Sequence, residues 1–160
     1  VREIHPRELR TELFLIRGIE LFDGTIEENL VVGNATITPA RLREVLRSVD
    51  LEREIDALPL GLRTFLHGNE WPLSRGQAHR LMLARAILAA PRLLVLDETL
   101  DSIDRKALTT VLETLTAFAE NCTVIVLTHE PELTAGFDDV YILENGKIRA
   151  LDATERLVRS

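Results

Sequence analysis

Short apolar runs alternate along this chain with stretches in which apolar side chains recur every three or four residues. Four runs have the length of a strand: residues 13–16, 92–96, 123–128 and 140–143. The second and third runs are almost entirely apolar, which is typical of strands buried on both faces of a parallel sheet. We therefore predict an α/β fold in which strands and helices alternate in the second half of the chain.

The region between the first and second runs, residues 25–90, has a mostly helical pattern. Pro39 marks a helix start, because proline fits the first turn of a helix. The apolar positions that follow form one stripe: Leu42, Val45, Leu46 and Val49. Another helix starts at Ser74, where Ser74 and Gln77 match a capping box, and Pro91 stops it.

Two further helices and a turn are predicted in the second half. Residues 104–119 carry apolar positions on one side of a helix, and residues 153–158 fit a short helix at the end of the chain. Asn145 and Gly146 follow the last apolar run and are a strong signal for a tight turn. The expected organisation is a strand-and-helix core with a helical region inserted between its first two strands.

The composition narrows the possible functions. The chain has 160 residues, of which 46% are hydrophobic and 28% charged, as in an ordinary globular domain. Its formal net charge of -7 argues against a general nucleic-acid surface, because phosphate backbones attract Lys- and Arg-rich faces. The single cysteine, Cys122, can form no internal disulfide, which indicates a reducing compartment. No apolar stretch approaches the roughly 18 residues expected of a membrane-spanning helix.

Two adjacent carboxylates follow the strand predicted at residues 92–96. Ligands of open parallel sheets bind beyond the carboxyl ends of the strands, which is where Asp97 and Glu98 stand. One carboxylate there can hold a magnesium ion through water, and the other can orient an attacking water molecule. Taken alone, a buried strand that runs into an acidic loop explains these residues equally well.

The helix start at residues 73–77 offers a second chemical group. A helix N-terminus presents backbone N–H groups and positive potential, so it favours phosphate. Ser74 adds a hydroxyl, Arg75 adds a cation, and Gly76 permits close approach of the backbone. A plain capping box of Ser74 and Gln77 is the alternative, and for this segment alone it is the stronger one. This helix is followed by the apolar strand that ends in Asp97 and Glu98, and the combination makes phosphate binding a much more specific interpretation.

Taken together, these segments resemble the motifs of ABC-type ATPase domains. Residues 73–77 (Leu-Ser-Arg-Gly-Gln) and 83–86 (Leu-Ala-Arg-Ala) resemble the signature motif, and residues 94–98 (Leu-Val-Leu-Asp-Glu) resemble Walker B. Other segments match in order: 21–30 after the Q-loop of exporter-type domains, 100–104 at the D-loop, 127–129 at the H-loop and 143–148 at the final hairpin. The resemblance covers nearly the whole chain. It implies a P-loop NTPase (RecA-like) parallel-sheet core with an inserted ABC helical subdomain.

The resemblance implies ATP and Mg²⁺ as cofactors and a role for each matching residue. Asp97 would hold the water shell of the magnesium ion, and Glu98 would polarise the attacking water. His129 would contact the γ-phosphate and couple it to Glu98. His79 matches no motif and is expected to be a packing or surface residue. A further set would face the ATP held by the opposite subunit of a head-to-tail dimer: Ser74, Arg75, Gly76, Gln77 and Asp104.

The sequence departs from the family pattern in three places. No Gly-x-x-x-x-Gly-Lys-Ser/Thr phosphate loop (Walker A) occurs in the 160 residues, so we expect a domain truncated at its N-terminus and inactive alone. The position of the Q-loop glutamine falls at Arg17, whose charge suits a magnesium site poorly. Arg75 replaces the first glycine of the signature, which the start of a helix tolerates.

These observations divide the chain into three predicted segments. Residues 1–24 hold the Q-loop strand and the start of the core, residues 25–90 form the helical subdomain that ends in the signature helix, and residues 91–160 form the α/β core with Walker B, D-loop and H-loop. The resemblance implies an ATPase that drives export, linked to transmembrane domains at the cytoplasmic face of a membrane, with no nucleic-acid partner.

Two alternatives stay open. One is a degenerate nucleotide-binding half that acts as a regulatory or dimerisation module, which Arg17 supports and which Glu98 and His129 oppose. The other is a non-transport relative that acts on DNA, against which the acidic balance and the exporter-like segment at residues 22–26 argue.

Overall fold

The computed structural model describes residues 12–68 and 71–151 and divides into two compact units, Val1–Leu127 and Thr128–Ser160. The helix predicted over residues 153–158 lies outside the described residues. None of the described helices is long and apolar enough to cross a membrane.

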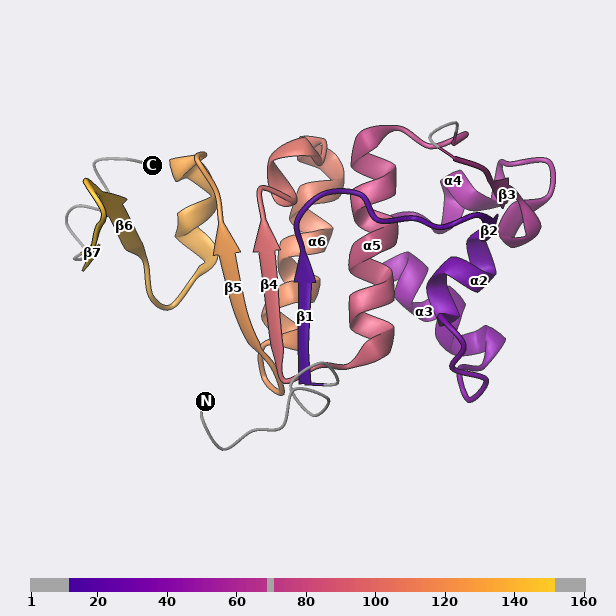
Figure 1. Cartoon of the computed structure of the whole chain (residues 1–160), viewed down its shortest axis with the longest axis horizontal. Helices are drawn as coiled ribbons and strands as arrows, with labels where there is room; N and C mark the ends of the chain where they lie inside the picture. Colours follow the sequence, from indigo (N-terminus) through magenta and orange to yellow (C-terminus); the bar gives the residue numbers. More distant parts are fainter. Residues whose placement is uncertain (1–11, 69–70, 152–160) are drawn as a thin grey trace. The chain divides into compact units, whose positions relative to one another are not determined.

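The first unit is built on a three-stranded parallel sheet in the order β1-β4-β5 (Figure 1). Its strands are β1 (Leu13–Ile16), β4 (Leu93–Asp97) and β5 (Thr123–Leu127). The register pairs Leu13 with Leu93 and Leu93 with Thr123, so the three strands begin level with one another. Three of the four predicted strands are confirmed, and with them the parallel sheet of the α/β fold.

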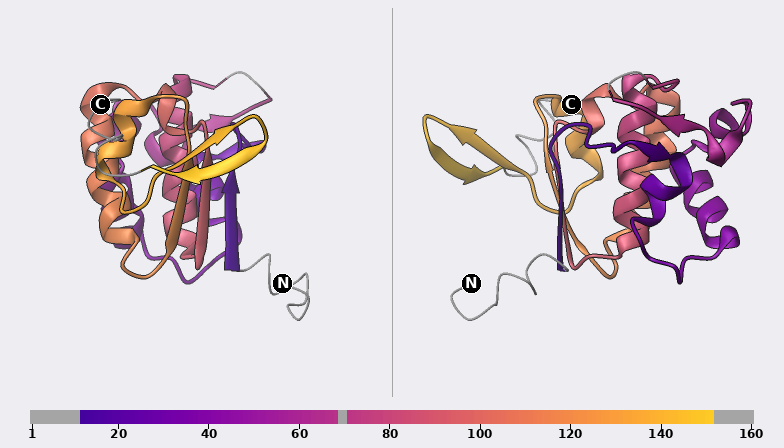
Figure 2. Two further views of the ribbon diagram at one scale, coloured as in Figure 1. Left: turned by 90° about the vertical axis from the view of Figure 1, so that its left-hand side faces the viewer. Right: turned by 45° about the vertical axis from the view of Figure 1, so that its right-hand side comes forward.

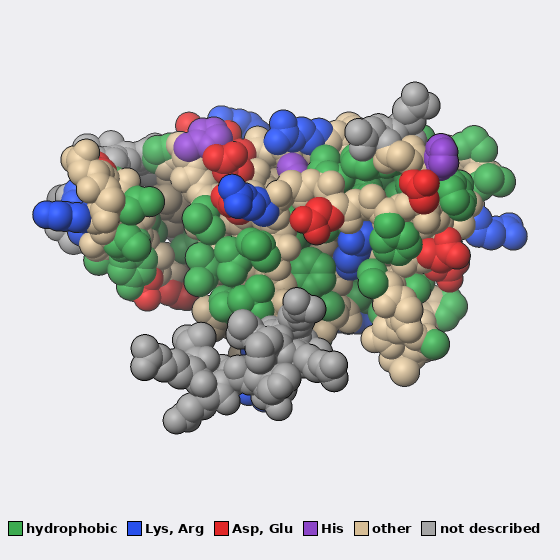
Figure 3. All heavy atoms as spheres, in the orientation of Figure 1, with side chains coloured by type: hydrophobic (Ala, Val, Ile, Leu, Met, Phe, Trp, Pro, Cys, Tyr) green, Lys and Arg blue, Asp and Glu red, His purple; other side chains and the backbone are tan. Residues whose placement is uncertain are grey.

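One face of this sheet is buried, and the other carries exposed apolar side chains. Ile16, Leu94 and Leu96 have no exposed surface, and the helices α5 (Arg75–Ala89) and α6 (Arg105–Phe118) run along their side of the sheet (Figure 2). Side chains of a strand alternate between faces, so the neighbouring positions point the other way. Three of these stay about half exposed: Leu15 (48%), Ile125 (46%) and Leu127 (47%). Hydrophobic side chains accordingly gather over the strands in Figure 3.

Helix α5 begins and ends where the sequence predicts. Ser74 is its N-cap and forms the predicted capping box with Gln77. The helix ends at Ala89, followed by Ala90 in the left-handed conformation (φ 47°) and then by Pro91. Nine of its fifteen residues are buried. Because the buried residues lie all round the helix, α5 is the central helix of the first unit.

The region predicted to be mostly helical, residues 25–90, contains three helices and a 3-10 turn before α5. It holds α2 (Ile26–Val31), α3 (Pro39–Ser48), α4 (Glu52–Asp56) and the 3-10 turn η1 (Gly61–Arg63). The predicted apolar stripe of α3 and the residue after it is buried, with no member more than 2% exposed. The sequence pattern does not predict a short antiparallel ladder, in which β2 (Gly24–Thr25) pairs with β3 (Phe65–Leu66). Strands of two residues are too short to leave a detectable periodicity.

The second unit contains a 3-10 segment and a hairpin. Its elements are η3 (Pro131–Gly136), β6 (Tyr141–Glu144) and β7 (Lys147–Ala150), and the two strands pair antiparallel. Asn145 (φ 51°) and Gly146 (φ 75°) form the connecting turn, both in the left-handed region that this dipeptide favours. The fourth predicted strand and the tight turn are therefore confirmed.

Candidate functional site

The carboxyl ends of β1 and β4 bring one cation and two carboxylates together. Because the register pairs the last residue of β1 with Leu96, Arg17 and Asp97 stand side by side. Arg17 Nε lies 3.4 Å from Asp97 Oδ2, and the two side chains are 78% and 31% exposed. Glu98 follows with a φ of 52° and an exposed side chain, and its backbone N–H donates to the last carbonyl of β5 (2.9 Å). The carboxylates predicted for Walker B thus lie at the carboxyl end of β4, the central strand of the sheet.

The N-terminus of α5 holds the residues predicted for the signature motif. Ser74 Oγ accepts from the Gln77 N–H (3.2 Å), and Gln77 Oε1 accepts from the Ser74 N–H (2.8 Å). A Cβ added at Gly76 would lie only 2.7 Å from the backbone oxygen of Ser102, in the 3-10 turn η2 (Leu100–Ser102). Glycine is therefore required here by the close approach of two backbones of the same chain, whatever its role toward a ligand.

These elements surround a hollow of about 310 Å³, which we call the polar hollow. Its lining residues are Arg17, Gly18, Arg75, His79, Asp97 and Glu98. His79 is buried, and its Nδ1 contacts Ser102 Oγ, so the expectation of a packing residue is confirmed. Burial, together with the positive charge of Arg75, lowers the pKa of His79 below its ordinary value, which leaves the ring neutral at pH 7. The polar hollow thus brings Arg75 of the predicted signature together with both predicted Walker B carboxylates.

The other two predicted site residues occupy different places. Asp104 is the N-cap of α6, where its Oδ1 accepts from the Ala107 N–H (3.1 Å). Hydrogen bonds from the backbone, that of Ala107 above all, lower the pKa of Asp104. His129 lies in the second unit with an exposed side chain. The dimer-interface role of Asp104 and the coupling of His129 to Glu98 stay predictions.

Asp97 is the residue predicted to hold a metal ion. Among residues 12–68 and 71–151, no group of three or more His, Cys, Asp or Glu side chains is placed to hold one. Asp97 supplies carboxylate oxygens of the kind that Mg²⁺ prefers, and its side chain is partly exposed. The carboxylate therefore fits a magnesium ion as a single ligand, whereas the Arg17 guanidinium beside it is a competing cation.

Helix α5 also carries two arginines whose contacts the sequence analysis missed. Arg80 is buried, and its Nη2 donates to Glu54 Oε1 (2.9 Å). Arg85 donates from Nε to the Asn29 carbonyl (2.6 Å), from Nη1 to the Glu20 carbonyl (2.8 Å) and from Nη2 to Asn29 Oδ1 (2.8 Å). Charged residues are rarely buried unless they are paired, so two arginines in the interior of a mostly apolar helix are the signal that could have revealed these contacts.

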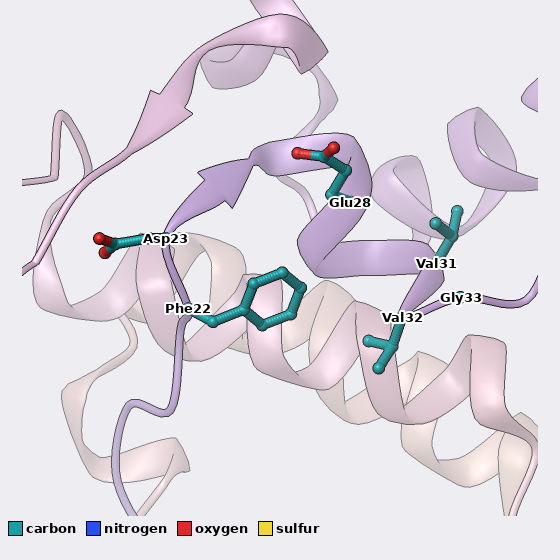
Figure 4. Close-up of a pocket in the computed structure, with 6 residues that line it drawn as sticks. All are labelled: Phe22, Asp23, Glu28, Val31, Val32 and Gly33. Atoms are coloured by element: carbon teal, nitrogen blue, oxygen red, sulfur yellow. The ribbon is translucent and has the colours of Figure 1, made fainter.

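Asn29 and Arg85 both contact Phe22, which lines a second hollow of about 480 Å³ that we call the apolar hollow. Asn29 has no exposed surface; it accepts from the Phe22 N–H (3.0 Å) and donates to the Phe22 carbonyl (2.9 Å). The Arg85 guanidinium lies 5.6 Å from the centre of the Phe22 ring. In Figure 4 the Phe22 ring and the Val32 side chain point toward each other across the hollow. Its lining residues are Phe22, Asp23, Glu28, Val31, Val32 and Gly33.

Comparison with known sequences connects these sites to a family. The family model described as "ABC transporter" matches residues 8–101. Over 150 residues the chain is 33% identical to an ATP-dependent lipid A-core flippase of Bordetella pertussis, an alignment that covers 92% of this chain and 24% of the flippase. It is also 33% identical over 161 residues to the multidrug resistance protein sirA of Leptosphaeria maculans, covering 99% of this chain and 13% of that protein.

Comparison with solved structures leads to the same family as comparison with known sequences. A bacterial Atm1-family ABC exporter with ATP bound superposes with a TM-score of 0.82 and 25% identity, over 89% of this chain and 25% of the exporter chain. The chain thus spans a quarter or less of the length of the proteins it matches. The parallel sheet and its helices match an ABC ATPase domain, which confirms the predicted fold class. The chain belongs to the ABC transporter family, as part of an ATP-binding domain of the exporter type.

Proposed function

We propose that this chain is the catalytic part of an exporter ATPase domain, which hydrolyses ATP to drive transport across a membrane. The observation that carries the proposal is the polar hollow, where Asp97 and Glu98 at the carboxyl end of β4 meet Arg75 at the N-terminus of α5. Phosphoryl transfer relies on positioned charges of this kind more than on covalent chemistry. Membership of the ABC transporter family supports the same function.

Each site residue has a defined task in this proposal. Glu98 accepts a hydrogen bond from the attacking water and polarises it. Asp97 would hold Mg²⁺, which when bound neutralises charge on the phosphates. Ser74 and Gln77 contact the nucleotide held by a second ATPase domain in a head-to-tail dimer, and His129 contacts the γ-phosphate. Hydrolysis also needs a phosphate loop, and these 160 residues contain no Walker A motif. We therefore expect the chain alone to turn over no ATP.

We further propose that the chain works at the cytoplasmic face of a membrane, linked to transmembrane domains. Two of the similar proteins are named as a flippase and an exporter, which supports a membrane partner. The apolar hollow supports it independently, because Phe22 and Val32 are 44% and 56% exposed beside a concave surface. Exposed apolar side chains around a hollow are typical of a protein contact, and a segment of the membrane domains is the occupant that we propose.

The ion pair of Arg17 with Asp97 favours one alternative function. A degenerate nucleotide-binding half would bind ATP without hydrolysing it and would act as a regulatory or dimerisation module. In such a half the Asp97 carboxylate could stay paired with Arg17, whereas hydrolysis needs it free for the metal. Glu98 is intact, which supports hydrolysis.

Glu98→Gln in the full-length protein separates these two functions. Glutamine keeps the shape and hydrogen bonding of the side chain but loses the charge that polarises water. We expect ATP binding to be retained and phosphate release to fall by about 100-fold or more. Glu113→Gln, which changes an exposed glutamate on α6, is the matched control and should keep wild-type turnover. Unchanged turnover in Glu98→Gln would mean that the full-length protein hydrolyses ATP at a site that does not use Glu98, which would give Glu98 a structural role and favour the regulatory module.

A further inference from the structure

Arg17 and Asp97 form an ion pair that the sheet register itself creates. The two strands run parallel, and the first residue after β1 stands beside the last residue of β4. A buried side chain fixes both strand ends, because Thr99 Oγ1 lies within hydrogen-bond distance of the Ile16 carbonyl (3.3 Å) and the Asp97 carbonyl (3.4 Å). The backbone therefore places Arg17 beside Asp97, and in this structure Arg17 Nε lies 3.4 Å from Asp97 Oδ2.

The residues that line the polar hollow carry no net negative charge. Its charged lining residues are Arg17 and Arg75 against Asp97 and Glu98, so their formal charges cancel. His79 contributes no charge at neutral pH, because burial lowers its pKa. Proteins hold hard divalent cations with carboxylate oxygens. One of the two carboxylates available here is already paired with a cation of the same chain.

We propose that Arg17 is a built-in counterion of Asp97 and competes with a divalent cation for its carboxylate. This inference rests on the proposed function, since it concerns how metal binding is regulated at that site. A guanidinium is permanently charged, so a metal ion that reaches Asp97 must displace Arg17 or bear its repulsion. The Arg17 side chain is 78% exposed and can move into solvent. Metal binding is therefore weakened by Arg17 rather than abolished.

A Mn²⁺ titration of the full chain tests the competition without nucleotide or turnover, with free Mn²⁺ measured by electron paramagnetic resonance. Arg17→Gln removes the charge, and we expect it to raise the affinity for Mn²⁺ about threefold to tenfold over wild type. Arg17→Lys keeps the charge and should keep the wild-type affinity. Arg53→Gln removes an exposed arginine on α4 and is the matched control; it should change the affinity by less than about twofold, because salt screens distant charges.

The double variant Arg17→Gln with Asp97→Asn identifies the carboxylate. The gain in Mn²⁺ affinity should vanish in it, because the ligand for which Arg17 competes is gone. Equal affinities of wild type and Arg17→Gln would overturn the proposal, as would undetectable binding by both or a gain that persists without Asp97. Circular dichroism of Arg17→Gln should match wild type, since the side chain is exposed.

The outcome of the Mn²⁺ titration can be distinguished from the outcome of the Glu98→Gln experiment. If Glu98→Gln keeps wild-type turnover while Arg17→Gln gains Mn²⁺ affinity, only the proposed function fails. If Glu98→Gln loses turnover while the Mn²⁺ titration of Arg17→Gln stays at wild type, only the counterion role of Arg17 fails.

Discussion

The polar hollow and the apolar hollow of the first unit are built in different ways. The polar hollow collects residues from three segments that are distant in sequence, residues 17–18, 75–79 and 97–98. The apolar hollow is lined by one stretch, residues 22–33. Strand ends and a helix N-terminus supply charges and free backbone groups, whereas a single folded segment can present apolar side chains on its own. If the proposed roles of the two hollows hold, chemistry and docking take place in separate parts of this unit.

Arg85→Met should destabilise the segment that lines the apolar hollow and leave the structure of the polar hollow unchanged. The change removes three charge-assisted hydrogen bonds to Asn29 and Glu20 and leaves their acceptors without that donor. We expect the free energy of unfolding in urea to fall by about 3 kcal/mol, the largest effect on stability among these variants. Arg41→Met, which removes an exposed pair with Glu44, should cost no more than about 0.5 kcal/mol.

Hydrogen exchange of the Arg85→Met variant sharpens the comparison. Amide protection should fall over residues 20–33 and stay unchanged over residues 93–97. If protection fell equally in both segments, the two hollows would belong to one cooperative structure, and their separation would be wrong.

Gly76→Ala should act on the polar hollow instead. The added Cβ would lie 2.7 Å from the backbone oxygen of Ser102, so α5 must shift against η2. Overpacking costs about 1–3 kcal/mol, and alanine regains up to about 1 kcal/mol of helix propensity, so we expect a net loss of about 1–2 kcal/mol in urea unfolding. Gly136→Ala is the control, because a Cβ there meets nothing within 4 Å. Equal stabilities of the two alanine variants would contradict the close approach.

The smallest expected effect is a pH dependence from His79. Burial and Arg75 lower the pKa of His79 in the folded state below the ordinary value of 6.5, so below that pH the unfolded chain binds a proton that the folded chain does not. Stability should therefore fall as the pH drops from about 6.5 toward the folded pKa, by at most about 1.4 kcal/mol per pH unit. His79→Gln should flatten this slope in urea unfolding. His67→Gln, at a side chain 80% exposed, should leave it in place.

The parts of the site that the sequence predicts are those defined by neighbours along the chain. The capping box joins Ser74 to Gln77 across three positions, and the Asp97–Glu98 pair directly follows an apolar run. Both features depend on local backbone geometry, which periodicity and capping rules describe. The strands of the parallel sheet, the starts of α3, α5 and α6, and the hairpin turn are predictable for the same reason.

The missed features depend on distances in space between segments far apart in sequence. The bonds from Arg85 to Asn29 span 56 positions, and the contact of Gly76 with Ser102 requires the packing of α5 against η2. The position of Arg17 could be suspected from the sequence, but its pairing with Asp97 follows only from the register of β1 on β4. Periodicity fixes which face a side chain takes, whereas tertiary packing decides its partner.

Helix α5 joins the two hollows mechanically. Arg75, in the first turn of α5, lines the polar hollow. Arg85 lies about 15 Å further along the helix axis, where it donates to the Glu20 carbonyl and contacts the Phe22 ring. A hydrogen-bonded helix resists stretching and compression, so a displacement at one of these two positions should move the other. A partner that pulls Phe22 outward must therefore either break the contacts of Arg85 or displace Arg75 together with the helix.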